Sequence, residues 1–121
     1  MYSTFYYIKQ KKVIQIEIND PQYAQKVKIA QSLYQVIDPE LFVNIIDLGL
    51  VYNIIYTDNT ITIIMTLSTP HCPLGDAITS GVNNALSVHF PGHAVTVQLV
   101  WEPKWNFEMM TAEGKKLLGI V

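Results

Sequence analysis

The sequence predicts an α/β protein of the α+β type, a two-layer sandwich in which helices cover a small mixed sheet. Apolar residues alternate with polar ones over the segments 60–68 and 95–101, which indicates strands, and the segment 50–57 is also predicted to be a strand. They recur at intervals of three and four residues over 21–36 and 73–90, which indicates amphipathic helices. The last two strands and the helix between them form a crossover unit, so these two strands are expected to be parallel.

The start of the chain is expected to differ from the rest. Residues 1–20 are predicted to be an N-terminal extension, followed by a single domain over residues 21–121. Within the extension, the segment 13–18, VIQIEI, alternates and predicts an extra strand with its isoleucines on one face. Asp20 followed by Pro21 then gives the usual start of a helix, a capping side chain before a proline.

A second start signal follows the first helix. Asp38, Pro39 and Glu40 repeat the pattern of a capping residue before a proline, and predict a short second helix. The stretch DLGL ends this helix at Gly49, because glycine readily adopts the left-handed conformation that terminates helices.

The remaining connections also carry local signals. Asp58 and Asn59 suit a two-residue hairpin turn with positive φ, so the strands on either side are expected to pair. Ile61, Ile63, Met65 and Leu67 share one face of the second of these strands. A last helix is expected from near Thr111 to Gly119.

Composition excludes several classes of protein. The chain has 121 residues, half of them hydrophobic and 15% charged, which is typical of one compact domain. Its net charge is −2, and its eight basic residues are all lysines, so nucleic acid is not an expected partner. No apolar run approaches the roughly 20 residues of a membrane span, and the N-terminal charges follow the apolar part, the reverse of a signal peptide. A lone cysteine predicts a reducing compartment, hence a cytoplasmic protein without a membrane partner.

That cysteine, Cys72, lies in the stretch LSTPHCPLGDAI at the junction of a strand and a helix. Pro73 favours the first helical position, which makes Cys72 the expected N-cap. The positive end of the helix dipole stabilises a thiolate, so we expect the pKa of this thiol to lie below its usual value of about 8.5. Gly75 in the first turn leaves the backbone open to close approach. The alternative is an inert, buried cysteine that only caps the helix, and the local pattern leaves both interpretations open.

Several stretches together resemble the iron–sulfur cluster assembly domain family, which includes SufT-like and PaaD-like proteins. The matching stretches cover about residues 25–119, in the order DPEL, NIIDLGLVY, MTLSTPHCPLGDAI, VQLVWEPKW and MTAEGKKLLG. The resemblance implies the same small sandwich, and a role in maturing iron–sulfur proteins or in assisting metalloenzymes. Its signature cysteine and aspartate fall on Cys72 and Asp47, and further motif positions fall on Glu40, Thr66 and Thr69.

The chain departs from the family pattern in two places. His71 stands where members often have glycine or another small residue, and residues 1–20 lie outside the family core. His71 beside Cys72 also suggests a catalytic Cys/His pair, but adjacent side chains usually point apart, which disfavours a hydrolase. His89 and His93 are expected too far along the helix to share a mononuclear site with Cys72. A closed zinc site, which wants four ligands, is also disfavoured.

Other motif residues have structural alternatives. Asp47 could tune the Cys72 pocket or accept backbone hydrogen bonds at the Gly49 turn, and we expect its loss to impair function more than folding. Glu40 suits the first turn of a helix. Trp105 could roof the cysteine pocket or contact a partner, whereas Trp101 is expected in the core. Met109 and Met110 are expected to fill the core rather than bind metal.

The sequence therefore predicts an iron–sulfur protein maturation factor rather than an enzyme. Cys72 is the expected metal ligand, binding iron or a cluster transiently or docking a client. Because a cluster needs about four ligands, it would have to be shared within a homodimer or completed by a client, glutathione or another carrier. Expected partners are the assembly machinery or client apoproteins. The rival hypothesis is an interaction adaptor without metal, or an accessory factor for a metalloenzyme such as a phenylacetyl-CoA oxygenase.

Overall fold

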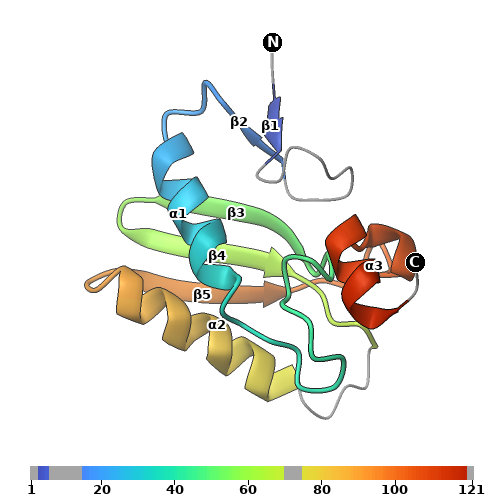
Figure 1. The fold of residues 1–121 in the computed structure, drawn as a ribbon. Coiled ribbons are helices and arrows are strands. Elements are labelled where there is room, and N and C mark those ends of the chain that lie inside the picture. Colours follow the sequence, from blue (N-terminus) through green and yellow to red (C-terminus); the bar gives the residue numbers. More distant parts are fainter. Residues whose placement is uncertain (1–2, 6–14, 70–74, 120–121) are drawn as a thin grey trace.

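The computed structural model describes residues 3–5, 15–69 and 75–119 as a small sheet covered by helices (Figure 1). Along the chain come β1 (Ser3–Phe5), β2 (Gln15–Glu17), α1 (Tyr23–Leu33), β3 (Val51–Thr57), β4 (Thr60–Met65), α2 (Gly75–His89), β5 (Ala94–Leu99), the 3₁₀ turn η1 (Phe107–Met109) and α3 (Ala112–Leu118). Among these helices none is long and apolar enough to span a bilayer.

The main sheet has the order β3-β4-β5 and is mixed, as the sequence predicts. β3 and β4 pair antiparallel around the turn Asp58-Asn59, whose φ angles of 48° and 64° match the expected hairpin. β4 and β5 pair parallel through the crossover helix α2, from Thr60 opposite Ala94 to Met65 opposite Leu99. The predicted fold class is confirmed.

One face of this sheet carries the core. α1 and α2 lie side by side on that face in Figure 1, and they contact each other. The alternating pattern of β4 buries Ile61, Ile63 and Met65 completely. The apolar stripe of α2 meets them through its buried Ile78, Val82 and Leu86. This burial of about twenty aliphatic side chains is the main stabilising term of the fold.

The segment 34–50, between α1 and β3, is not helical, so the predicted second helix is wrong. Asp38 does cap backbone N–H groups, since its Oδ1 accepts from Glu40 and Leu41 at 2.7 and 3.0 Å. The chain then reverses instead of winding on: Asp38 donates to the carbonyl of Val43, and Ile37 forms an isolated antiparallel bridge with Asn44. The result is a tight, tethered loop.

The N-terminal strands form a separate two-stranded sheet, with β1 antiparallel to β2. Part of the expected strand 13–18 is thus present as β2, where Ile16 is buried and Ile18 is 53% exposed. Residues 13 and 14 lie outside the described residues. The division into an extension, 1–20, and a domain, 21–121, stays a prediction.

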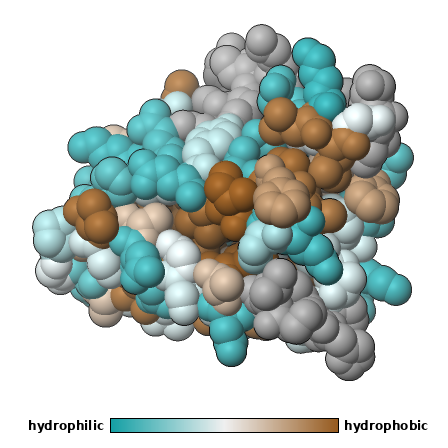
Figure 2. Space-filling view, turned by 60° about the horizontal axis from the view of Figure 1, so that its bottom comes forward, coloured by the Kyte–Doolittle hydropathy of each residue, from teal (hydrophilic) through white to brown (hydrophobic). Residues whose placement is uncertain are grey.

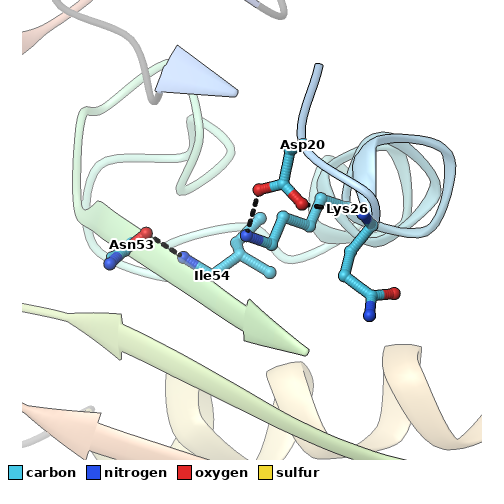
Figure 3. Close-up of polar contacts among 5 residues, drawn as sticks. Asp20, Lys26, Asn53 and Ile54 are labelled. Atoms are coloured by element: carbon cyan, nitrogen blue, oxygen red, sulfur yellow. Dashed lines mark hydrogen bonds and ion pairs between the residues drawn. The ribbon is translucent and has the colours of Figure 1, made fainter. Parts of the chain in front are cut away.

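Asp20 does not cap α1 directly, because the helix begins at Tyr23 and its N-cap is Gln22. Its carboxylate instead accepts from the backbone N–H of Gln22 and from the ammonium group of Lys26, each at 2.7 Å (Figure 3). This pair lowers the pKa of Asp20 below its usual value of 3.8, first through the Lys26 hydrogen bond and then through the Gln22 N–H. The acid thereby fixes the chain at the entry to α1.

Candidate functional site

The candidate site lies at the end of the sheet where β4 and β5 finish and α3 packs (Figure 1). Cys72 and His71 belong to the segment 70–74, which is outside the described residues. Thr69, which precedes this segment in the chain, is exposed, and α2 begins directly after the segment at Gly75. The predicted N-cap position of Cys72 therefore stays a prediction.

The two ends of this segment meet. A Cβ added to Gly75 would come within 2.9 Å of Leu67 Cδ1, so the start of α2 packs on Leu67, two residues after the end of β4. Thr66 is 1% exposed, and its N–H donates to the carbonyl of Leu50 at 2.8 Å. Leu67 and Gly75, which precede and follow the segment 70–74, thus pack together, and Thr66 binds Leu50 close in sequence to Asp47.

Asp47 itself is buried, and its carboxylate has two side-chain partners. Its Oδ2 accepts from Asn44 Nδ2 and its Oδ1 from the hydroxyl of Thr111, both at 2.8 Å. Backbone bonds extend the same junction, because the N–H of Asp47 donates to Asn44 Oδ1 and its carbonyl accepts from the N–H of Thr111. Thr111 also caps α3, accepting at its hydroxyl from the N–H of Gly114. Asp47 therefore joins the DLGL segment to the start of α3.

Close backbone packing reinforces that junction. Gly49 has φ of 78°, and a Cβ there would lie 2.2 Å from the carbonyl oxygen of Met109. A Cβ added to Gly114 would likewise lie 2.6 Å from the carbonyl oxygen of Asp47. Both glycines are needed because a side chain at either would collide with backbone. The segments 47–52 and 103–114 are consequently held together at several points.

The two tryptophans have different surroundings. Trp105 is half-buried, and its Nε1–H donates to the carbonyl of Leu48 at 2.7 Å, while its ring packs edge-on against Phe107. It thus covers the segment next to Asp47, and its predicted role as a roof or a partner contact stays open. Trp101 is 43% exposed, so the expectation that it lies in the core is wrong. It lies two residues after the end of β5.

Tyr52 belongs to the same junction, although sequence patterns did not single it out. Val51 pairs with Met65 and Asn53 with Ile64, so Tyr52 is the extra residue of a bulge in β3. A bulge redirects its side chain, and the Tyr52 hydroxyl donates to the carbonyl of Pro103 at 2.7 Å. Burial, and then the charge of Glu102, raises the pKa of Tyr52. In the sequence, the available signal for this bulge was that apolar and polar residues do not alternate regularly around Tyr52.

The other predicted candidates are not part of this hydrogen-bonded junction. Glu40 is exposed in the tethered loop, where its N–H donates to Asp38, and no helix is present for it to begin. His89 lies within 3.4 Å of Gln35 Oε1, and His93 lies 2.9 Å from the Tyr56 hydroxyl, both near the far end of α2.

Metal-binding groups are sparse in the part of the chain that is described. No cluster of three His, Cys, Asp or Glu side chains occurs among these residues. Met110 is 2% exposed within the core, as predicted, and Met109 Sδ lies 3.5 Å from the Tyr52 hydroxyl. The described ends of the Cys72 segment are therefore built from packing and backbone hydrogen bonds.

Comparison with known proteins agrees with the resemblance in the motifs. The model of the family described as iron–sulfur cluster assembly protein matches residues 26–99. An Fe-S protein maturation auxiliary factor of Porphyromonas gingivalis is 38% identical over 77% of this chain and 90% of its own. The auxiliary factor YitW of Bacillus subtilis is 40% identical, over 80% of this chain and 96% of its own.

Solved structures agree with the fold. A crystal structure of a domain of unknown function from Bacillus anthracis superposes with a TM-score of 0.77 at 39% identity, covering 81% of this chain and 94% of the other. A conserved hypothetical protein of Thermotoga maritima gives a TM-score of 0.65 at 35% identity, covering 75% and 90%. With its motifs, its sheet order and most of its length accounted for in this way, the chain belongs to the iron–sulfur cluster assembly protein family.

Proposed function

We propose that this protein is an auxiliary factor in the maturation of iron–sulfur proteins, with Cys72 as the residue that handles iron or a cluster. The observation that carries the proposal is the match to relatives named as such factors over most of the chain. The protein acts here as a binding and docking factor, and the cluster is its cargo rather than a resident cofactor.

The described ends of the Cys72 segment support this assignment. Thr66 and Leu67 are fixed against Leu50 and Gly75, so the segment is tethered at both ends to rigid elements. Cys72 lies three residues before the start of α2, a helix of 15 residues. The free N–H groups and the dipole of such a helix favour an anion near its N-terminus. A thiolate in this segment would be a suitable soft ligand for iron.

Ligand number decides how a cluster would be held. One thiolate per chain leaves a cluster, which needs about four ligands, under-coordinated. A second copy of the chain or a client protein would supply the rest, which makes transient transfer the natural use of the site. We propose Asp47, Glu40, Thr66, Thr69, His71 and Trp105 as further functional positions.

Anaerobic reconstitution tests the carrier function. Wild-type protein and the Cys72→Ser variant would be incubated with ferrous iron and sulfide, desalted, and compared by visible absorption and by iron and sulfide content. We expect retained absorption that requires Cys72. A Ser80→Ala variant, at an exposed position of α2 to which no role is assigned, serves as the control. Equal, negligible loading of wild type and Cys72→Ser would contradict the carrier function and favour the metal-free adaptor.

A further inference from the structure

Phe42 combines an unfavourable backbone conformation with an exposed side chain. Its φ is 61°, in the left-handed region that bulky side chains rarely adopt, and the residue is 79% exposed. The other described non-glycine residues with positive φ are Asp58 and Asn59, where the hairpin turn requires that conformation. Burial of the Phe42 side chain does not compensate for this backbone strain, so other contacts must maintain the conformation.

The strain is maintained by Asp38, which is fully buried. The N–H of Phe42 donates to the Asp38 carbonyl at 2.7 Å, and the Asp38 N–H donates to Val43 at 3.0 Å. The carboxylate holds the two intervening N–H groups through Oδ1. With both backbone and side chain of one residue engaged, the loop 38–43 has little freedom. It therefore holds the backbone of Phe42 in a conformation that leaves the phenyl ring exposed.

The surroundings of the ring are apolar and acidic. Ile37, at the base of the loop, is 49% exposed, and Glu40 is exposed between them in sequence. Hydrophobic side chains do reach the surface of this molecule in groups, as Figure 2 shows for one face. Residues 29–103 contain no lysine or arginine and six carboxylates, so no basic side chain in this span can neutralise Glu40.

The exposed area indicates what kind of partner would cover this surface. The free parts of the two apolar side chains amount to about 200–250 Å², judged from usual side-chain areas. A standard interface buries roughly 800 Å² on each partner, so this surface is too small to be a flat dimer interface by itself. A single protruding aromatic ring instead resembles the central residues that dominate binding energy when they fill a pocket.

We propose that the loop 37–43 is a docking knob, in which Phe42 inserts into an apolar pocket of a partner protein whose rim carries lysine or arginine opposite Glu40. This inference goes beyond the maturation function, because it requires neither Cys72 nor a bound metal. Strain and exposure are the costs of keeping the ring available, and complementary charge sets the orientation of the partner.

The stability half of the proposal uses two substitutions at the same position. Phe42→Gly removes the ring and relieves the backbone strain, whereas Phe42→Ala removes the ring and keeps the strain. We expect the glycine variant to unfold at a temperature no more than about 2 °C below wild type, and above the alanine variant. A glycine variant that melts far below wild type would show that the ring supports its own chain, and would overturn the proposal.

The binding half uses a photoreactive probe in the cells that produce this chain. p-Benzoyl-L-phenylalanine would be placed at position 42 and, as a matched control, at Val88, which is 74% exposed on α2. The protein crosslinked at position 42 would be identified and purified, and its affinity for each variant measured. We expect Phe42→Gly and Phe42→Ala to weaken binding equally, by at least about tenfold, and Val88→Ala to leave it unchanged. We also expect the wild-type affinity to fall as salt rises.

The remaining outcomes decide between occupants. Crosslinking of the chain to itself, with self-association lost in Phe42→Gly, would replace the partner protein by a second copy. Equal crosslinking at positions 42 and 88, or unchanged affinity of Phe42→Gly, would overturn the docking role. Cluster loading of Phe42→Gly should equal that of wild type, so a failure of docking is distinguishable from a failure of the carrier function.

Discussion

At the scale of single residues, the motif aspartate acts as a joint. Asp47 occupies both carboxylate oxygens within the chain and lies 64 positions from its partner Thr111. A buried carboxylate with two hydrogen bonds of 2.8 Å is stabilising as long as both partners remain. A structural role for Asp47 is therefore supported by specific contacts. These contacts are with the side chains of Asn44 and Thr111, not with backbone N–H groups at the Gly49 turn as expected. Its functional role stays a prediction.

A double-mutant cycle measures this joint. Asp47→Ala should lower the free energy of unfolding by about 2–4 kcal/mol, because it leaves Asn44 and Thr111 without their partner. Thr111→Val should cost about 1–2 kcal/mol. In urea denaturation the double variant should be less destabilised than the sum, by about 1 kcal/mol. Strict additivity would mean that the two side chains do not interact in solution.

The same variants address function. If Asp47 only joins the two segments, the loss of client maturation in cells should follow the loss of stability for Asp47→Ala and Thr111→Val alike. If Asp47 also tunes the Cys72 segment, Asp47→Ala should lose more maturation than Thr111→Val at matched stability. Both substitutions break the same hydrogen bond between Asp47 and Thr111, so any additional loss in Asp47→Ala is due to the carboxylate.

At the scale of elements, local signals predicted most boundaries but not every conformation. The hairpin at Asp58-Asn59, the crossover unit and the stop of α3 at Gly119, with φ of 76°, follow from patterns within a few residues. The helix expected after Asp38 did not form, although its capping bonds did, because the chain there pairs Ile37 with Asn44 instead. Capping chemistry alone does not distinguish a helix start from a capped loop.

Two of the three described glycines with positive φ, Gly49 and Gly92, make a matched pair that separates backbone conformation from collision. Gly49→Ala should cost several kcal/mol, because a Cβ would collide with the Met109 carbonyl oxygen at 2.2 Å. Gly92→Ala, with φ of 87° and no atom within 4 Å of the added Cβ, should cost only about 1 kcal/mol. Thermal and urea unfolding of both variants would check this. Equal losses would show that conformation rather than collision dominates at Gly49.

The contribution of Asp20, at the entry to α1, to the stability of the fold should depend on pH. The pKa of Asp20 is lowered in the folded protein by Lys26 and Gln22, so the folded state favours the ionised acid. Its contribution is therefore present above the usual value of 3.8 and is lost as pH falls through the lower folded pKa. Asp20→Asn should reduce stability at pH 7 by less than about 1 kcal/mol, since the pair is partly exposed.

The pH profile supplies the control for this substitution. The difference between wild type and Asp20→Asn should shrink in urea unfolding as pH falls below 3.8 and through the lowered pKa of the folded state, because the wild-type carboxyl then becomes neutral as well. A difference that stays constant throughout this acid titration would show that the Lys26 ion pair does not contribute.

At the scale of the whole molecule, the sequence predicted the layers, the hairpin and the parallel crossover strands but not how distant segments meet. β3, β4, β5 and α2 are recognisable because their apolar periods are local. The contacts of Tyr52 with Pro103 and of Trp105 with Leu48 span 51 and 57 residues, and no periodicity encodes them. The motif stretches indicated which residues mattered, whereas the folded chain explains several of them as one junction.

Oligomeric state is the prediction that belongs to this scale. Wild-type protein should form a dimer on anaerobic addition of iron and sulfide, and Cys72→Ser should remain unchanged, because one thiolate per chain cannot complete a cluster. Sedimentation velocity with and without metal would measure this.

The N-terminal strands provide the control for association. Because β2 already pairs with β1 in the same chain, deletion of residues 1–19 should leave the metal-dependent dimer intact. Loss of the metal-dependent dimer in the deletion variant, rather than in Cys72→Ser, would assign association to the N-terminal strands.

The absence of lysine and arginine from residues 29–103 has a consequence for experiments on this protein. Trypsin cleaves after lysine and arginine, so complete digestion should leave β3, β4, α2, β5 and the single thiol in one long peptide ending at Lys104. Amine-directed crosslinkers would have no lysine to react with anywhere in that span. Such reagents could report on a partner docked at Phe42 only through lysines outside this span, whereas carboxylate-directed or photoreactive chemistry can act within it.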